Sequence, residues 1–108
     1  MAAKRAILDA HCRAIGRDPA EIVTSQQCLA AIAGDHAEAE RRTASLMNVL
    51  GFLEGAPHLA LCGTPDEIRR RVDANRALGI TYFVMTLGRQ TDPEDVRLFG
   101  REVVAAYA

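Results

Sequence analysis

The sequence lacks a strong excess of charge of either sign. Thirteen basic residues stand against fourteen acidic ones, which gives a formal net charge of -1. Nucleic acids and anionic membranes attract proteins through surplus positive charge, so this balance indicates neither partner. The hydrophobic share of 49% and the charged share of 25% are typical of an ordinary folded domain.

Long apolar runs and paired cysteines are also missing. No segment approaches the ~18 apolar residues that a membrane span requires, and polar residues interrupt the opening stretch MAAKRAILDAHCRAIG before it reaches signal-peptide length. Cys12, Cys28 and Cys62 form no C-x-x-C pair and no zinc-finger pattern with a histidine. We therefore expect buried thiols, no metal site, no membrane contact and a cytoplasmic location.

A length of 108 residues allows one small core. Hydrophobic spacing predicts helices over 3–15, 35–50, 64–79 and 93–107, strands over 22–33 and 80–87, and an irregular connection over 51–62. The unbroken apolar run ITYFVMTL suggests a strand covered on both faces. Strands that alternate with amphipathic helices indicate a parallel α/β sheet joined by right-handed crossovers.

The stretch CGTPDEI could cradle a phosphate or begin a helix. Thr64 has the position of an N-cap, Pro65 the first helical position, and Glu67 completes a capping box. Asp66 and Glu67 would also repel a phosphate at the positive end of the helix dipole. We interpret this turn as a helix start, and the DPED at 92–95 as a second one.

Few residues point to chemistry. The three histidines are far apart, so no shared proton or metal is indicated. Gln26 and Gln27 point to opposite faces of a predicted strand, so that one could line a pocket, although exposure at a sheet edge explains them equally well. Thr86, Gly88 and Arg89 follow the second predicted strand, where parallel α/β folds bind ligands. An ordinary surface loop is the alternative there.

Three long stretches together suggest a family. RAILDAHCRAIGRDPAEIVTSQQ, CGTPDEIRRRVDANRALGITYFVMTLG and DPEDVRLFGREVVAAY resemble the C-terminal third of the luciferase-like monooxygenases, which are flavin- or deazaflavin-dependent oxidoreductases built on a (β/α)8 barrel. The resemblance covers almost the whole chain and depends on the order of its motifs. It implies that residues 1–108 are a single partial domain of a TIM barrel, with its last two strands and flanking helices in the order helix-strand-helix-helix-strand-helix.

The resemblance suggests which residues lie near a pocket, but it suggests no catalytic residue. None of the matching motifs is catalytic, so no catalytic residue is assigned. Loops after the last barrel strands face the pocket mouth in that family, which makes Gly34, Thr86, Gly88 and Arg89 the candidates for contact with a substrate or cofactor. FMN or a deazaflavin is the implied cofactor of the intact barrel, and no cofactor is the alternative for this chain alone.

The resemblance and the chain length together set the expected function. A complete barrel takes about 250 residues and eight strands, so two strands could not enclose a flavin. We expect a segment of a luciferase-like oxidoreductase that is not catalytic alone. The alternatives are a non-catalytic oligomerising remnant and a small α/β binding module. A two-stranded sheet has open edges, so a homo-oligomer or a complementing barrel fragment is the expected partner.

Overall fold

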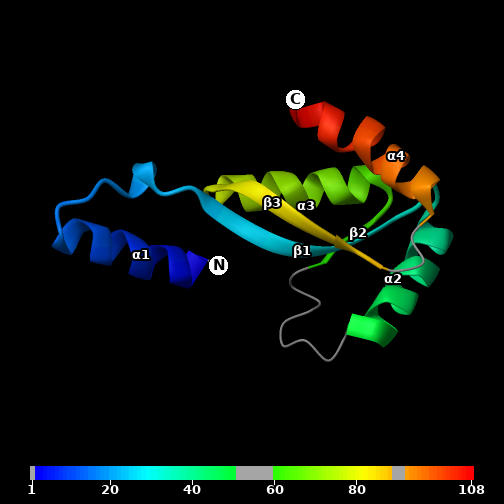
Figure 1. Ribbon diagram of the computed structural model, residues 1–108, viewed down its shortest axis with the longest axis horizontal. Helices are drawn as coiled ribbons and strands as arrows, with labels where there is room; N and C mark the ends of the chain where they lie inside the picture. Colours follow the sequence, from blue (N-terminus) through cyan, green and yellow to red (C-terminus); the bar gives the residue numbers. More distant parts are fainter. Residues whose placement is uncertain (1, 51–59, 89–91) are drawn as a thin grey trace.

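A three-stranded parallel sheet lies at the centre of the molecule (Figure 1). The fold comes from a computed structural model, and the structure describes residues 2–50, 60–88 and 92–108. In chain order the elements are α1 (Ala2–Ala14), η1 (Pro19–Glu21), β1 (Thr24–Ile32), α2 (His36–Leu50), β2 (Ala60–Gly63), α3 (Pro65–Ala77), β3 (Ile80–Leu87), α4 (Pro93–Glu102) and η3 (Val104–Tyr107).

The strands lie in the order β2-β1-β3, so that β1 is central. Leu29 of β1 pairs with Ala60 of β2, and Gln26 of β1 pairs with Phe83 of β3. Both pairings are parallel. The carboxyl ends of all three strands therefore meet at one edge of the sheet, and the helices α2, α3 and α4 begin at that edge.

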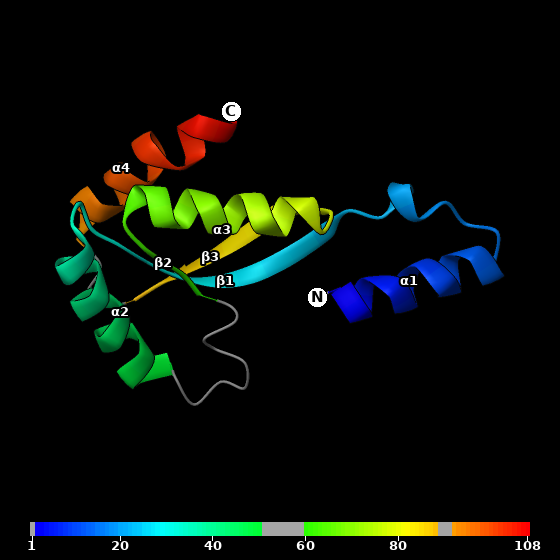
Figure 2. The same ribbon diagram turned by 180° about the vertical axis from the view of Figure 1, so that it is seen from behind.

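Helices α3 and α4 pack on one face of the sheet, and α2 covers the part of the other face formed by β1 and β2. Alternate residues of a strand point to opposite faces. The even-numbered side chains of β1 pack with α3 and α4 in one apolar cluster, made of Cys28, Ala30, Ile32, Leu61, Ile68, Val72, Phe99 and Val103. On the other face Leu29 packs with Leu46 of α2, together with Ala60 and Cys62. The view from behind shows α3 running alongside the sheet and α2 beyond the end of β1 (Figure 2).

The predicted fold is wrong in its strands and in its architecture. Residues 60–63, assigned to a connection, form the buried strand β2, so the order helix-strand-helix-helix-strand-helix omits a strand. The chain steps from β1 outward to β2 and then back across β1 to β3. Right-handed crossovers in opposite directions place their helices on opposite faces. Barrel helices all lie outside the barrel, so this open sheet is not the predicted (β/α)8 TIM-barrel fragment.

The predicted helix starts are confirmed. Thr64 accepts a hydrogen bond from the backbone N–H of Glu67, whose side chain completes the capping box, and Pro65 takes the first helical position. Asp92 caps α4 by accepting from the backbone N–H of Glu94 at 2.8 Å, and Pro93 takes the first helical position. Asp35 accepts from the N–H of Glu38 at 2.9 Å. The side chain of Glu38 instead contacts two arginines of α2, described below.

Helix α1 lies apart from the sheet (Figure 1). Its predicted apolar stripe is largely uncovered, because Cys12 is its one buried residue while Ile7 remains exposed. Arg5 donates from Nη1 to Oγ1 of Thr24 at 2.6 Å and so connects the helix to the start of β1. The Cα radius of gyration is 15.5 Å, above the ~13 Å of a compact chain of this length. The molecule is therefore elongated.

Candidate functional site

The predicted pocket residues lie at the carboxyl edge of the sheet. Gly34 follows β1 and is exposed, and Gly88 follows β3 and is half-buried. Thr86 accepts a hydrogen bond from Nε2 of Gln27 at 3.2 Å across β1 and β3. Parallel pairing thus brings these positions to one edge. Arg89 lies outside the described residues. Nothing in this arrangement assigns the four positions a ligand, so their role stays a prediction.

A polar cleft separates the starts of α2 and α3 at this edge. It measures about 410 Å³ and contains His36, Glu40, Thr43, Cys62 and Glu67 among its lining residues. The imidazole Nδ1 of His36 lies 2.6 Å from Oε1 of Glu67, and its Nε2 lies 3.1 Å from Oε1 of Glu40. The hydrogen bond to Glu67 raises the pKa of His36, and the same bond lowers the pKa of Glu67.

Gly63 sets the position of Glu67 in this cleft. Its φ of +141° is a conformation that residues with a Cβ rarely adopt. A Cβ built there would lie 2.4 Å from Oε2 of Glu67. The glycine at the end of β2 therefore allows the carboxylate to reach both the backbone of Thr64 and the ring of His36.

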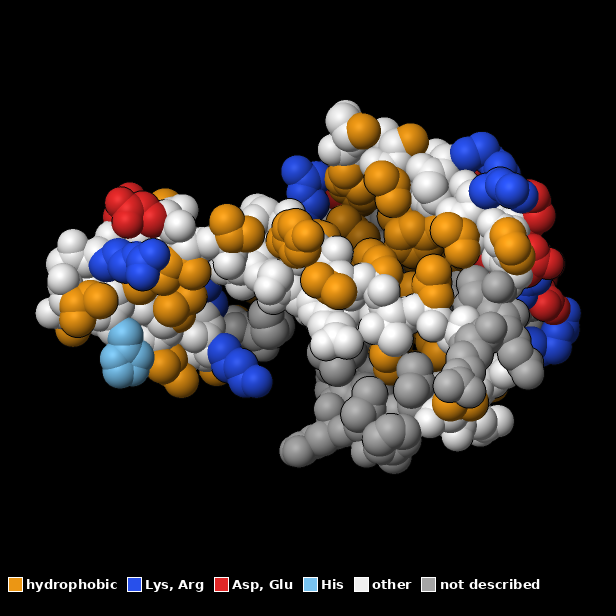
Figure 3. All heavy atoms as spheres, in the orientation of Figure 1, with side chains coloured by type: hydrophobic (Ala, Val, Ile, Leu, Met, Phe, Trp, Pro, Cys, Tyr) orange, Lys and Arg blue, Asp and Glu red, His pale blue; other side chains and the backbone are white. Residues whose placement is uncertain are grey.

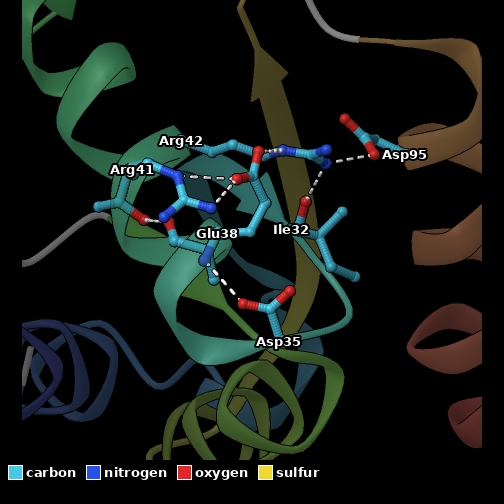
Figure 4. A network of polar contacts seen from close by, with 8 residues as sticks. Ile32, Asp35, Glu38, Arg41, Arg42 and Asp95 are labelled. Carbon is cyan, nitrogen blue, oxygen red and sulfur yellow. Dashed lines mark hydrogen bonds and ion pairs between the residues drawn. The ribbon is translucent and has the colours of Figure 1, made fainter.

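A second polar network ties α2 to β1 and α4 (Figure 4). Arg42 donates from Nη1 to the carbonyl oxygen of Ile32 at 2.8 Å and to the carboxylate of Asp95, while its Nε lies 3.0 Å from Glu38. Glu38 also accepts from Arg41, and this contact is the main cause of its lowered pKa. Arg42 thus satisfies the last carbonyl of the central strand and has its charge paired within the protein.

The thiol of Cys62 has the wrong environment for a nucleophile. Burial raises the pKa of Cys62 above its ordinary value, and its sulfur lies 3.5 Å from the carbonyl oxygen of Leu29. A reactive cysteine needs a lowered pKa and access to solvent. Among the described residues no group of three or more His, Cys, Asp or Glu side chains is placed to hold a metal ion. The side chains of His36, Glu40 and Glu67 in this cleft are paired with one another.

An apolar groove lies between β3 and α4, and we call it the β3–α4 groove. Figure 3 shows hydrophobic side chains gathered there. It has a volume of about 630 Å³ and is lined by Val72, Arg76, Thr81, Phe83, Met85, Leu87, Val96, Phe99, Gly100, Val103, Val104, Tyr107 and Ala108. Arg76 is the one side chain with a formal charge among these lining residues, and its guanidinium lies 5.0 Å from the centre of the Tyr107 ring.

One buried polar atom beside the core has no partner. Gln26 points inward from β1 and is buried, whereas Gln27 points to the open face. The opposite orientations of the two amides are confirmed. Oε1 of Gln26 makes no hydrogen bond within the described part of the chain. Gln26 does not line the β3–α4 groove, so this unpaired oxygen does not mark a ligand site there.

Sequence reasoning missed the residues that organise this edge. His36 is one of three histidines that are far apart in sequence and indicated no site, and neither Arg42 nor Asp95 was a candidate residue. The ion pairs His36–Glu67 and Arg42–Asp95 span 31 and 53 residues of sequence, and no local spacing predicts such contacts. Two apolar residues of the predicted helix 93–107, Val96 and Val103, line the groove, and their spacing was the available sequence signal for it.

Comparison with known proteins gives one match, at the level of structure. No family model matches the sequence, and no characterised protein matches it. The crystal structure of monooxygenase RslO1 from Streptomyces bottropensis is similar to this chain with a TM-score of 0.63 and 23% identity. The similarity covers 99% of this chain and 38% of RslO1. This chain therefore shares the fold of part of a monooxygenase and spans well under half of that protein's length.

Within residues 2–50, 60–88 and 92–108 no helix is long and apolar enough to cross a membrane. The expected cytoplasmic location and the description of residues 1–108 as a single partial domain stay predictions.

Proposed function

We propose that this chain is the C-terminal segment of a luciferase-like, flavin- or deazaflavin-dependent monooxygenase, and that it does not catalyse alone. The observation that carries the proposal is the fold similarity to the monooxygenase RslO1 over 99% of this chain. The order of the GRDPAEI, GTPDEI and A-L-G-I motifs supports the choice of family. The proposed cofactor of the whole enzyme is FMN or a deazaflavin.

The described residues do not fit the phosphate of such a cofactor. Helix N-termini are the usual phosphate sites of α/β proteins. Here the starts of α2, α3 and α4 carry acidic side chains, namely Asp35 and Glu38, Asp66 and Glu67, and Asp92, Glu94 and Asp95. Negative charge at all three positions repels a phosphate. Phosphate binding, and hence flavin chemistry, is assigned to polypeptide beyond these residues.

The test is to extend the reading frame and compare the products. Genomic DNA upstream of the Met1 codon is sequenced, and the longer in-frame product is expressed beside the 108-residue chain. We expect the longer product to bind FMN or a deazaflavin and to consume oxygen with a reduced cofactor, and the short chain to do neither. The lack of an in-frame extension, or turnover by the short chain alone, would contradict the proposal.

A non-catalytic self-associating α/β protein is the second candidate. The uncovered apolar surface along β3 favours it, because Tyr82 and Val84 are exposed on one face and the β3–α4 groove opens on the other. Flat titrations of the longest in-frame product with both cofactors, together with a stable oligomer, would favour this candidate over the first.

A further inference from the structure

The outer edge of β3 is open. β3 lies at the end of the sheet, and no strand within the described ranges pairs with its outer side. It is eight residues long and reads ITYFVMTL, with no charge and no proline. Natural proteins protect such edges with charges, prolines, bulges or covering elements. The free N–H and C=O groups along this edge therefore fit a partner that is itself a β-strand.

Apolar surface continues on both sides of this edge. On the α3 and α4 face, Phe83, Met85 and Leu87 line the β3–α4 groove. On the opposite face Tyr82 is 59% exposed and Val84 47% exposed. A partner that adds a strand here would bury side chains of both faces at once, which an isolated peptide covering one face would not do.

We propose that the partner is a second copy of this chain, whose β3 pairs antiparallel with the first about a two-fold axis at Val84. The result is a continuous six-stranded sheet with an isologous interface. Directly opposite residues of an antiparallel pair lie on the same face. The α4 helices of the two copies therefore lie on the same side, where their two grooves face one another and the exposed Val96 and Val104 gain apolar neighbours.

The charges around β3 suit this reversed pairing. A strand without charged residues places no like charges opposite one another when it pairs with itself. Arg76 lies in the groove wall near the start of β3 and makes no ion pair among the residues the structure describes. Asp92 and Glu94 follow the end of β3. Glu94 is paired with Arg97, so Asp92 is the carboxylate that an antiparallel partner brings toward Arg76, whereas a parallel partner would not.

This inference goes beyond the proposed function, since the interface needs no cofactor. The test begins with the mass of the wild-type chain, measured by light scattering after size exclusion over a range of concentrations. We expect twice the chain mass of 11.7 kDa. A wild-type chain that stays monomeric throughout would overturn the proposal, whatever the flavin titrations give.

Charge variants at the centre of β3 test the pairing itself. Val84→Lys and Val84→Glu each place two like charges opposite one another, and we expect each to weaken the dimer at least tenfold. Mixing the two variants should restore a mixed dimer, because Lys then faces Glu. Val49→Lys is the matched control, since Val49 is 68% exposed on α2, away from the edge. Variants that stay dimeric alone, or a mixture that stays monomeric, would show that β3 does not pair with itself.

A cysteine variant tests the same contact in the unperturbed sheet. Val84→Cys brings two thiols together at the proposed axis, within the Cα separation of about 7 Å that a disulfide tolerates. We expect rapid cross-linking of two copies under mild oxidation, while Val49→Cys stays uncross-linked. The native cysteines are all buried. A dimeric Val84→Cys chain that does not cross-link would place the interface elsewhere and overturn the proposal.

Discussion

The imidazole of His36 joins the start of α2 to the start of α3 through the carboxylate of Glu67, with Nδ1 2.6 Å from Oε1. The two residues are 31 positions apart in sequence. They come together because β1 and β2 are parallel neighbours whose carboxyl ends meet at one edge. This contact spans the polar cleft and links the two faces of the sheet.

The His36–Glu67 contact should make stability depend on pH. The raised pKa of His36 gives stabilisation that is full below its ordinary value of 6.5 and is lost as pH rises through the folded value. The lowered pKa of Glu67 gives stabilisation that is present above its ordinary value of 4.5 and is lost as pH falls. The urea midpoint of the wild type should therefore exceed that of His36→Gln most clearly between about pH 5 and 6.5.

The control for this pH series is His11→Gln. His11 is exposed on α1 and makes no ion pair within the described residues. Its substitution should leave the difference from the wild type constant across the series. A gap between wild type and His36→Gln that grows from pH 6.5 to pH 9 would contradict the assignment.

Replacing Gly63 by alanine should disturb the same contact. The new Cβ would meet Glu67 at 2.4 Å, and the backbone φ of +141° is strained for any side chain. We expect a loss of ~1–3 kcal/mol in the free energy of unfolding, together with a fall in the pKa of His36 measured by NMR titration. Gly34→Ala is the matched control, because a Cβ at Gly34 would have no other heavy atom within 4 Å. Equal effects of the two changes would count against this account.

Removing the cap of α3 should destabilise the fold. Thr64→Ala deletes the side-chain oxygen that accepts from the N–H of Glu67, and loss of such a cap costs about 1 kcal/mol. Ser45→Ala on the exposed part of α2 is the control and should change the free energy of unfolding by less than ~0.5 kcal/mol. Both values come from urea denaturation followed by circular dichroism.

Replacing Gln26 by methionine should stabilise the protein. The change keeps nearly the same shape and removes a buried oxygen that lacks a hydrogen bond in the described structure. Relief of one unsatisfied buried group contributes ~1–3 kcal/mol. Gln27→Met removes the hydrogen bond to Thr86 on the open face and should bring no gain. A Gln26→Met chain that is less stable than the wild type in thermal melts would contradict this expectation.

Local signals predicted the helices well and the sheet poorly. Thr64 and Asp92 cap their helices within three residues of sequence, and a capping pattern needs no knowledge of the rest of the fold. The strand β2 was missed because four buried residues, ALCG, carry no period and become a strand only beside β1. The strand β3 was placed correctly from Ile80 to Leu87, but one of its faces is open rather than covered.

The placement of three candidate residues at the sheet edge was predicted, while their role stays a prediction. The rule that parallel strands end at one edge brought Gly34, Thr86 and Gly88 to the same side of the sheet, as the structure has them. The contacts that dominate this edge, from His36 to Glu67 and from Arg42 to Asp95, depend on which strands are neighbours. The strand order β2-β1-β3 could not be read from local periodicity, so neither contact could be expected.

The position of α1 has a practical consequence. Arg5 connects the first turns of this helix to Thr24 at the start of β1, whereas its last turns lie away from the sheet and from the polar cleft (Figure 1). A fluorophore or an affinity tether attached to its last turn, for instance at a cysteine that replaces the exposed Arg13, would report on tumbling and assembly without contacting either surface. The last turn of α1 is therefore a suitable attachment point for immobilising the protein, because the sheet stays accessible to molecules in solution.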